Sequence, residues 1–321
     1  VLNSVSKQVP ANNKEFKVDG YNSQMALKMA YLADGVFWDD FGKKAFKSQG
    51  IVYDGHIDKK EGLVNLQYAY GHKGNLNSNM DIYISIRGSK EEMDWVTDAN
   101  FVADKYDEKI DDKIEVHSGF LQSANLLISQ EKLSKIAGST LSKLIALNAS
   151  KKRSDNFYIT GHSLGGAVAT IYATKLLDRG IKRDKLHVYT FGAPPISMDE
   201  GDVKKSIKSG SITAVASSAL DSSLSTKSEK GVNFYIDRYK NRIDIYRVYD
   251  KNDLIPKLLP PARHLGKEVQ FGDKLSAKEL IDMDKMWKIH WMNNYIKQIK
   301  KGKPQDPNSG NSVASQLMGL F

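Results

Sequence analysis

The feature that most constrains the fold of this chain is a glycine-rich corner, Gly161-His162-Ser163-Leu164-Gly165-Gly166. The run before it, residues 156–160, is β-branched and aromatic and predicts a short buried strand. The run after it, Ala167 to Asp178, has apolar residues at helical spacing and predicts a helix. A serine between strand and helix, with a glycine two residues away on each side, is the nucleophile-elbow pattern. The sequence therefore predicts that Ser163 is a nucleophile.

The elbow places a steric demand on its glycines. The turn must be tight enough to strain the serine backbone and lift the hydroxyl clear of the sheet, so positions 161 and 165 have no room for a side chain. Small residues at Gly165, Ala169 and Ala173 also allow the helix to lie close to the preceding strand. The pentapeptide alone occurs by chance in ordinary turns, and the strand and helix around it make the prediction specific.

The bulk composition limits the class of protein. The 321 residues are 40% hydrophobic and 26% charged, as in soluble globular proteins. No run approaches the ~20 apolar residues that span a bilayer. The chain has no cysteine, which excludes disulfides, thiolate metal sites and cysteine nucleophiles. No histidine pair has metal-ligand spacing, so no metal site is expected.

The net charge of +9 is carried by lysines scattered along the chain. Proteins that bind nucleic acid more often gather basic residues on one face with aromatic residues between them, so we expect no nucleic-acid partner. A solvated basic surface is the simplest interpretation, and attraction to anionic lipid surfaces is the alternative. The first residues lack the regions of a signal peptide. A start at Val1 is compatible with a mature or trimmed form, and we expect a secreted protein.

The rest of the chain predicts a single α/β domain over residues 1–321. Further strands are expected at 63–70 and 80–86, as a hairpin, and at 187–191, 243–249 and 265–271. Further helices are expected at 21–32, 38–46, 117–149 with a break near Gly138, and 278–299. A helix between two buried strands is a βαβ unit, which implies parallel pairing. Three segments stand apart from this pattern: an N-terminal arm at 1–20, a serine-rich insertion at 199–240 and a loose tail at 303–321.

The strand at 80–86 carries a period-two pattern. Ile82, Ile84 and Ile86 alternate with Tyr83 and Ser85. Such alternation predicts a strand with one buried face.

An activated serine needs a base within hydrogen-bond reach and a carboxylate that orients the base. In α/β-hydrolases these groups follow in the chain order serine, acid, histidine. Asp250 and Asp253 both follow the strand at 243–249, at the edge where ligands bind in parallel α/β sheets. Of the two late histidines, His290 follows the last strand, whereas His264 precedes it. Topology therefore favours His290 as the base and leaves the two aspartates open.

The whole constellation resembles the class 3 lipase family, the fungal-lipase-like branch of the α/β-hydrolases. The resemblance runs from about residue 21 to residue 296 and rests on motifs at 83–89, 95–98, 116–120, 159–167, 191–194, 252–256, 259–261 and 290. It implies the α/β-hydrolase fold, with a mostly parallel central sheet and helices on both faces. It also implies Ser163 as nucleophile, Asp253 as orienting acid and His290 as base.

The same resemblance assigns an oxyanion hole and a lid. Ser89 and the backbone N–H of Leu164 would stabilise the negative oxygen of a tetrahedral intermediate. The segment 89–100, with Trp95, aligns with the family's lid. This chain departs from the family in that its lid is acidic and only sparsely apolar, its 199–240 insertion is longer, and the disulfides of fungal members are absent.

These features predict a serine carboxylic-ester hydrolase of lipid esters, of the triacylglycerol lipase type, that works through an acyl-enzyme without a cofactor. A phospholipase A acting on membrane phospholipids is the alternative within the enzyme class, and the basic surface favours it. A non-catalytic, lipid-binding descendant of the fold is the alternative of another class. The expected partners are a lipid ester and a lipid or membrane interface. The oligomeric state stays open.

Overall fold

The structure is a computed structural model, and it describes residues 16–38, 40–62, 64–88, 103–107, 109–197, 233–258, 262–273, 275–276, 279 and 282–307. Within them lies a seven-stranded sheet with the order β1-β2-β3-β8-β9-β10-β11. Its strands are β1 (Val52–Glu61), β2 (Val64–Lys73), β3 (Asp81–Ile86), β8 (Asn156–His162), β9 (Leu186–Phe191), β10 (Ile245–Asp250) and β11 (Lys267–Phe271).

The sheet is antiparallel at one side and parallel over the rest. β1 pairs with β2 and β2 with β3 in antiparallel register, whereas every pair from β3 to β11 is parallel. The predicted hairpin is therefore confirmed as β2–β3, and the predicted parallel βαβ unit is confirmed as β8, α6 (Leu164–Asp178) and β9. Two small hairpins lie outside the sheet: β4 (Ala103–Asp107) with β5 (Asp111–His117), and β6 (Lys135–Ile136) with β7 (Ser139–Thr140).

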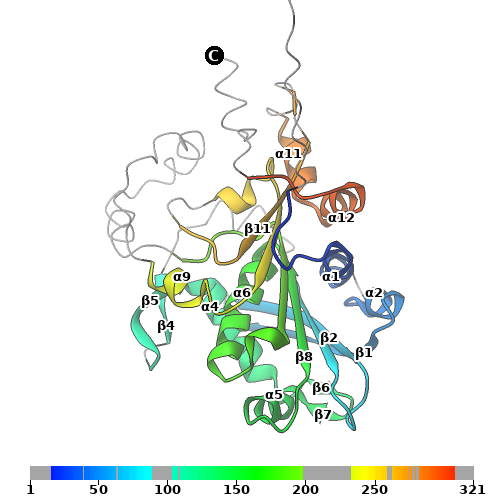
Figure 1. The fold of residues 1–321 in the computed structure, drawn as a ribbon, viewed down its shortest axis with the longest axis vertical. Helices are drawn as coiled ribbons and strands as arrows, with labels where there is room; N and C mark the ends of the chain where they lie inside the picture. Colours follow the sequence, from blue (N-terminus) through cyan, green and yellow to red (C-terminus); the bar gives the residue numbers. More distant parts are fainter. Residues whose placement is uncertain are drawn as a thin grey trace, which may run out of the picture.

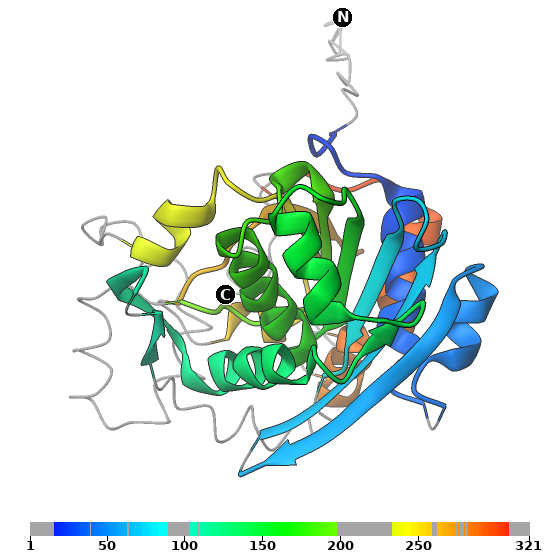
Figure 2. The same cartoon turned by 90° about the horizontal axis from the view of Figure 1, so that it is seen from below.

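Helices cover both faces of the sheet, as Figures 1 and 2 show. On one face α4 (Ser118–Gln130), α5 (Leu141–Ala149), α6 and α9 (Phe234–Tyr239) contribute to one hydrophobic cluster. On the other face α1 (Ser23–Gly35), α2 (Lys43–Ser48) and α12 (Met292–Lys301) contribute to a second cluster. The helix α11 (Met283–His290) lies at the edge where the parallel strands end, at the top of Figure 1. This three-layer arrangement confirms the predicted α/β class.

Burial on both faces changes the interpretation of β3. Ile82, Ile84 and Ile86 pack in the first cluster, but Tyr83 and Ser85 on the opposite face are buried as well, at 1% and 0% exposure. The Ser85 hydroxyl donates to the carbonyl of Leu32 in α1 over 2.9 Å. The prediction of a single buried face is therefore wrong, because α1 covers the other one.

Several element boundaries also differ from the prediction. The strand β1 was not predicted, because its mostly polar residues are largely exposed and give no apolar alternation. The helix expected over 38–46 is confined to α2, and the helical region over 117–149 is divided by the β6–β7 hairpin, which turns at Gly138 (φ 85°). The closing helical region is two helices separated by Trp291.

The insertion and the tail lie only partly within the described residues. The end of the insertion forms α9, whereas residues 198–232 lie outside the described part of the chain, as does the arm at 1–15. The tail predicted to be loose does contact the sheet at its start, since the N–H of Gln305 donates to the carbonyl of Gln270 in β11 over 2.7 Å. No helix among the described residues is long and apolar enough to cross a membrane.

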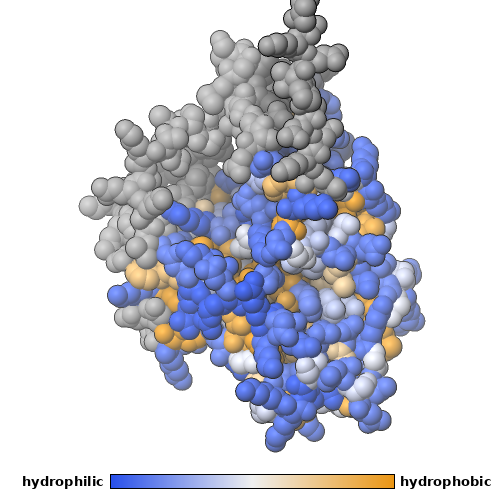
Figure 3. Space-filling model, in the orientation of Figure 1, coloured by the Kyte–Doolittle hydropathy of each residue, from blue (hydrophilic) through white to orange (hydrophobic). Residues whose placement is uncertain are grey.

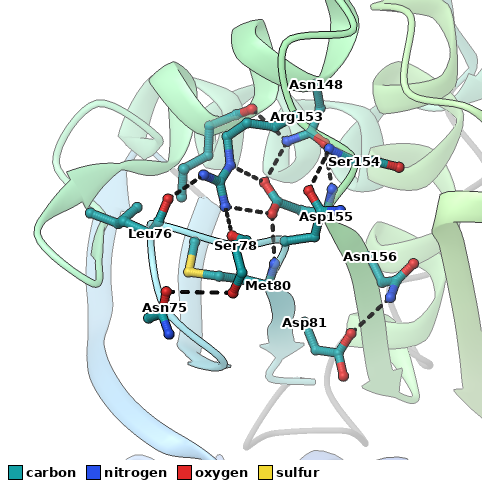
Figure 4. Close-up of polar contacts among 12 residues, drawn as sticks. Asn75, Leu76, Ser78, Met80, Asp81, Asn148, Arg153, Ser154, Asp155 and Asn156 are labelled. Carbon is teal, nitrogen blue, oxygen red and sulfur yellow. Dashed lines mark hydrogen bonds and ion pairs between the residues drawn. The ribbon is translucent and has the colours of Figure 1, made fainter.

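A polar cluster fixes the amino end of β8, and Figure 4 shows it in detail. The Asp155 carboxylate has 0% exposure and accepts hydrogen bonds from the Met80 N–H, the Asn148 amide and the Arg153 guanidinium at 2.7–2.8 Å. Arg153 also donates to the carbonyls of Leu76 (2.7 Å) and Ser78 (2.6 Å) in the β2–β3 turn. We call Arg153, Asp155 and Asn148 the amino-end clamp. It joins β8 to the β2–β3 turn at the end of the strand opposite the elbow.

Candidate active site

The elbow has the strained geometry that its sequence predicts. Ser163 lies between β8 and α6 with φ 53° and ψ −131°, a left-handed φ that non-glycine residues seldom adopt. Its N–H donates to the carbonyl of Phe191 over 2.9 Å, and its carbonyl accepts from the N–H of Gly166 over 2.9 Å. A Cβ at position 161 would lie 2.3 Å from the carbonyl atoms of Gly165. A Cβ at position 165 would lie 2.3 Å from the carbonyl oxygen of Ile86 in β3, so both glycines are required by close backbone contacts.

The Ser163 side chain is buried at the point where several chain segments meet. It has 0% exposure, and no described residue hydrogen-bonds its Oγ. A Cβ at Gly88, just after β3, would lie 3.4 Å from the Ser163 Cβ. A buried hydroxyl held in strained backbone without a partner is costly for folding, and such strain is typical of reactive groups.

Asp253 and His290 form a buried pair beside the elbow. His290 Nδ1 donates to Asp253 Oδ2 over 2.7 Å, and both side chains have 1% exposure. A Cβ at Gly192, the residue after β9, would lie 2.9 Å from the His290 ring and 3.0 Å from Asp253 Oδ2. Because the preceding residue, Phe191, accepts the hydrogen bond from the Ser163 N–H, the ends of β8 and β9 bring this pair to the serine.

The Asp253 carboxylate is stabilised in its charged form. Burial alone would raise its pKa, but His290, the Tyr295 hydroxyl and the N–H of Ile255 (2.9 Å) outweigh burial and lower the pKa below its ordinary value. The Tyr295 hydroxyl donates to Oδ2, the same oxygen that accepts from His290. Tyr295 is fully buried in α12, five residues after His290. The carboxylate is thus fixed from two sides.

The structure distinguishes Asp253 from Asp250 and His290 from His264. Asp250 accepts from the Asn252 N–H (2.9 Å) and from the Asn294 amide (3.0 Å), and burial raises its pKa. His264 Nε2 donates to the carbonyl of Pro256 over 2.7 Å, and burial lowers its pKa well below the ordinary value. Asp253 and His290 are therefore brought together, whereas Asp250 and His264 make other contacts.

His162 contacts the site, although no role in it is predicted from the sequence. Its Nε2 donates to the backbone carbonyl of His290 over 2.7 Å, and the two rings lie 4.5 Å apart with a tilt of 36°. Burial, followed by the nearby His290, lowers the pKa of His162 to about 3, so its ring is neutral near pH 7. The residue next to the serine therefore holds the backbone of His290. Its position inside the elbow was the one signal that could have revealed this contact.

The remaining predicted site residues lie at the helix start or outside the described residues. Leu164 is the first residue of α6, and N–H groups in a first helical turn have no partner within the helix. Ser89 and Trp95 lie outside the described residues, as does the lid segment 89–100. Among the residues that the structure describes, no group of three or more acidic or histidine side chains could hold a metal ion.

The comparisons with known proteins identify the family and the fold. A model of the class 3 lipases matches residues 83–263, a range that includes Ser163 and Asp253. The chain belongs to the class 3 lipase family. A solved structure of a triacylglycerol lipase, described as having a catalytic centre formed by a serine protease triad, superimposes with a TM-score of 0.52, at 20% identity over 78% of this chain and 80% of that one. This likeness confirms the α/β-hydrolase fold.

Curated relatives match this chain over a shorter stretch. A secreted mono- and diacylglycerol lipase of Fusarium solani is 32% identical over 126 residues, 38% of this chain and 32% of that protein. A lipase of Rhizomucor miehei is 33% identical over 125 residues, 37% of this chain and 30% of that protein. The chain thus spans about a third of the length of the curated relatives it matches.

Proposed function

We propose that this chain is a serine carboxylic-ester hydrolase of lipid esters, of the triacylglycerol lipase type. The observation that carries the proposal is the buried His290–Asp253 pair, 2.7 Å apart, beside a serine with φ 53°. The family supports it, because the class 3 lipases are named for this chemistry. The name of the Fusarium relative supports a secreted protein.

The proposed reaction passes through an acyl-enzyme. Ser163 Oγ attacks the ester carbonyl carbon while His290 Nε2 takes the hydroxyl proton, and the oxygen of the tetrahedral intermediate becomes negative. His290 then gives the proton to the leaving alcohol as the carbon–oxygen bond of the ester breaks. Water, activated by the same histidine, releases the fatty acid. Asp253 keeps the Nδ1–H of His290 pointed toward itself, which leaves Nε2 facing the serine.

The negative oxygen would be stabilised by two donors. The N–H of Leu164 begins α6, where the helix dipole favours negative charge. We assign the Ser89 side chain as the second donor and Trp95 to a lid over the site. Losing one such donor costs about 3–4 kcal/mol of transition-state stabilisation.

A fluorophosphonate probe tests the nucleophile directly. We expect it to label the folded chain at Ser163 and to leave Ser163→Ala unlabelled. Asp253→Asn and His290→Ala should each remove most turnover of a p-nitrophenyl ester, whereas His264→Ala should retain it. An unlabelled wild-type chain would favour a non-catalytic, lipid-binding protein, and loss of activity only in His264→Ala would overturn the assignment of the base.

A phospholipase A is the second candidate, and the positive surface favours it. The net charge is +9, and residues 282–303, next to the site, contain six lysines and two aspartates. Rates with phospholipid, triglyceride and short p-nitrophenyl esters, measured side by side at physiological salt, separate the two candidates. A rate on phospholipid above that on triglyceride would favour the phospholipase.

A further inference from the structure

Three apolar side chains remain open to solvent beside the candidate active site. Trp38, Leu254 and Trp291 are 63%, 37% and 52% exposed. Leu254 directly follows Asp253, and Trp291 directly follows His290. Two of the three therefore come next in sequence to the buried acid–base pair. Large apolar side chains exposed together beside a site are typical of an interaction surface.

Trp38 lies far from the other two in sequence but at the same edge of the sheet. The preceding residue, Phe37, packs edge-on against His162 with ring centroids 5.8 Å apart. A side chain at Gly88, at the carboxyl end of β3, would meet the Phe37 ring. Trp38 follows α1, Trp291 precedes α12, and these helices share one hydrophobic cluster. Both tryptophans thus lie at the ends of helices in the same layer, near the carboxyl ends of the strands.

The helices around Trp291 are basic. Residues 282–303 carry six lysines against two aspartates. Lys288 and Lys297 are exposed and form no ion pair with any described residue. Lys301 approaches Asp273 only at 3.9 Å, between two exposed side chains. In Figure 3 hydrophobic and hydrophilic residues are intermixed in the upper part of the described surface, near α11 and α12.

We propose that Trp38, Leu254 and Trp291, with the lysines of α11 and α12, form a docking surface for an anionic lipid bilayer. We call these residues the lipid-docking rim. Tryptophan rings settle at the level of lipid headgroups, because they combine an apolar body with one N–H donor. Each lysine near an anionic membrane strengthens binding about fivefold. Neutral fat would give these lysines no electrostatic gain, and a second copy of a chain with charge +9 would repel them.

Docking in this way would bring the carboxyl ends of the strands toward the bilayer. A lipid ester could then pass from the membrane to Ser163 without crossing bulk water. The inference deepens the proposed function, because it names esters within anionic membranes as the substrate class. It does not require Trp95 or the lid segment to move.

Vesicle binding by the full chain carrying Ser163→Ala tests the rim without turnover. Binding to phosphatidylcholine vesicles is compared with binding to vesicles that also contain phosphatidylglycerol, by co-sedimentation. We expect about tenfold or stronger binding to the anionic vesicles, and a loss of at least about tenfold in Lys288→Glu/Lys297→Glu. Trp38→Ala/Trp291→Ala should weaken binding to both vesicle types. If the Ser163→Ala chain binds vesicles but the fluorophosphonate fails to label the wild-type chain, the proposed function is disproved and this inference stands.

Leu76 and Leu133 provide the matched control. They are 39% and 58% exposed, and Leu76 lies in the turn held by the amino-end clamp, at the opposite edge of the sheet. Leu76→Ala/Leu133→Ala should bind vesicles as strongly as the parent. Equal binding to both vesicle types by the parent, or an equal loss in this control, would overturn the inference. So would a monomer–dimer equilibrium, seen by sedimentation velocity without lipid, that only the tryptophan variants abolish.

Discussion

The two ends of β8 differ in how their buried polar side chains are hydrogen-bonded. At its amino end, the carboxylate of Asp155 is buried and accepts hydrogen bonds from Arg153, Asn148 and the Met80 N–H. At its carboxyl end, Ser163 is equally buried, but no described residue hydrogen-bonds its hydroxyl and its backbone is strained. A strand held firmly at one end can carry strain at the other. The comparison predicts that the amino end governs stability and the carboxyl end governs chemistry.

Ser163→Ala should give the largest effect of all. We expect it to lower kcat without lowering the free energy of unfolding. Removing the proposed nucleophile should lower kcat by about 10⁴–10⁶-fold on a soluble ester. The free energy of unfolding should stay equal or rise, because the lost hydroxyl is buried without a partner. Steady-state kinetics and urea unfolding measure the two quantities. A large loss of stability would show that Ser163 contributes to folding after all, and the contrast between the ends would fail.

Asp155→Ala should produce the reverse pattern. The change leaves the Arg153 guanidinium, the Asn148 amide and the Met80 N–H without their shared acceptor. Loss of one partner of a buried ion pair costs about 3–5 kcal/mol of unfolding free energy. We expect kcat per folded molecule to change by less than about twofold, because the lost hydrogen bonds lie at the end of β8 opposite Ser163. A kcat loss without a stability loss would contradict this division.

Tyr295→Phe should have an intermediate effect within the site. The variant keeps the buried ring but removes the hydroxyl that donates to Asp253, and kcat/KM should fall about tenfold. That hydrogen bond contributes to the lowered pKa of Asp253, so its loss raises this pKa. Asp253 is then protonated at higher pH, and the acid limb of the kcat/KM profile should move to higher pH.

Tyr235→Phe is the matched control for this shift. Tyr235 is also fully buried, but its hydroxyl bonds Thr174 Oγ1 over 2.9 Å, away from the acid–base pair. Its pH–rate profile should match that of the wild type. An unmoved acid limb in Tyr295→Phe would show that the tyrosine only fills space.

Arg153→Lys should give the smallest effect. Lysine keeps the charge beside Asp155 but cannot reach the carboxylate and the carbonyls of Leu76 and Ser78 together, because it lacks the planar guanidinium fork. We expect the free energy of unfolding to fall by about 1–2 kcal/mol, with activity unchanged. Urea unfolding beside Asp155→Ala checks this order. A loss of unfolding free energy as large as that of Asp155→Ala would mean that the stabilisation by the amino-end clamp depends entirely on the guanidinium fork.

The parts of the fold that could be predicted depend on local rules. The strand, the strained serine and the close-packed helix around Gly161 follow from sterics within a few residues, and the structure confirms them. The parallel order of β8 and β9 followed from chain connectivity alone. The exposed strand β1 could not be predicted, because polar edge residues leave no hydrophobic period.

The candidate site was predictable only where chain order constrains it. The position of His290 after the last strand favoured it over His264, whereas the choice of Asp253 over Asp250 rested on family resemblance. Tyr295 was missed because a buried tyrosine in an amphipathic helix has the same pattern as an ordinary core residue, and its partner lies 42 residues away. Such contacts are set by how α12 packs, which no local pattern reports.

The hydrogen bond from His162 to the carbonyl of His290 joins positions 128 residues apart. Under the proposed roles, a ribosome makes the nucleophile long before it makes the base. A chain that has emerged only as far as β11 can present its strained serine but has no histidine to activate it. Under these roles, a chain that ends before α11 lacks its proposed base, and the contact between His162 and His290 forms only when α11 has packed.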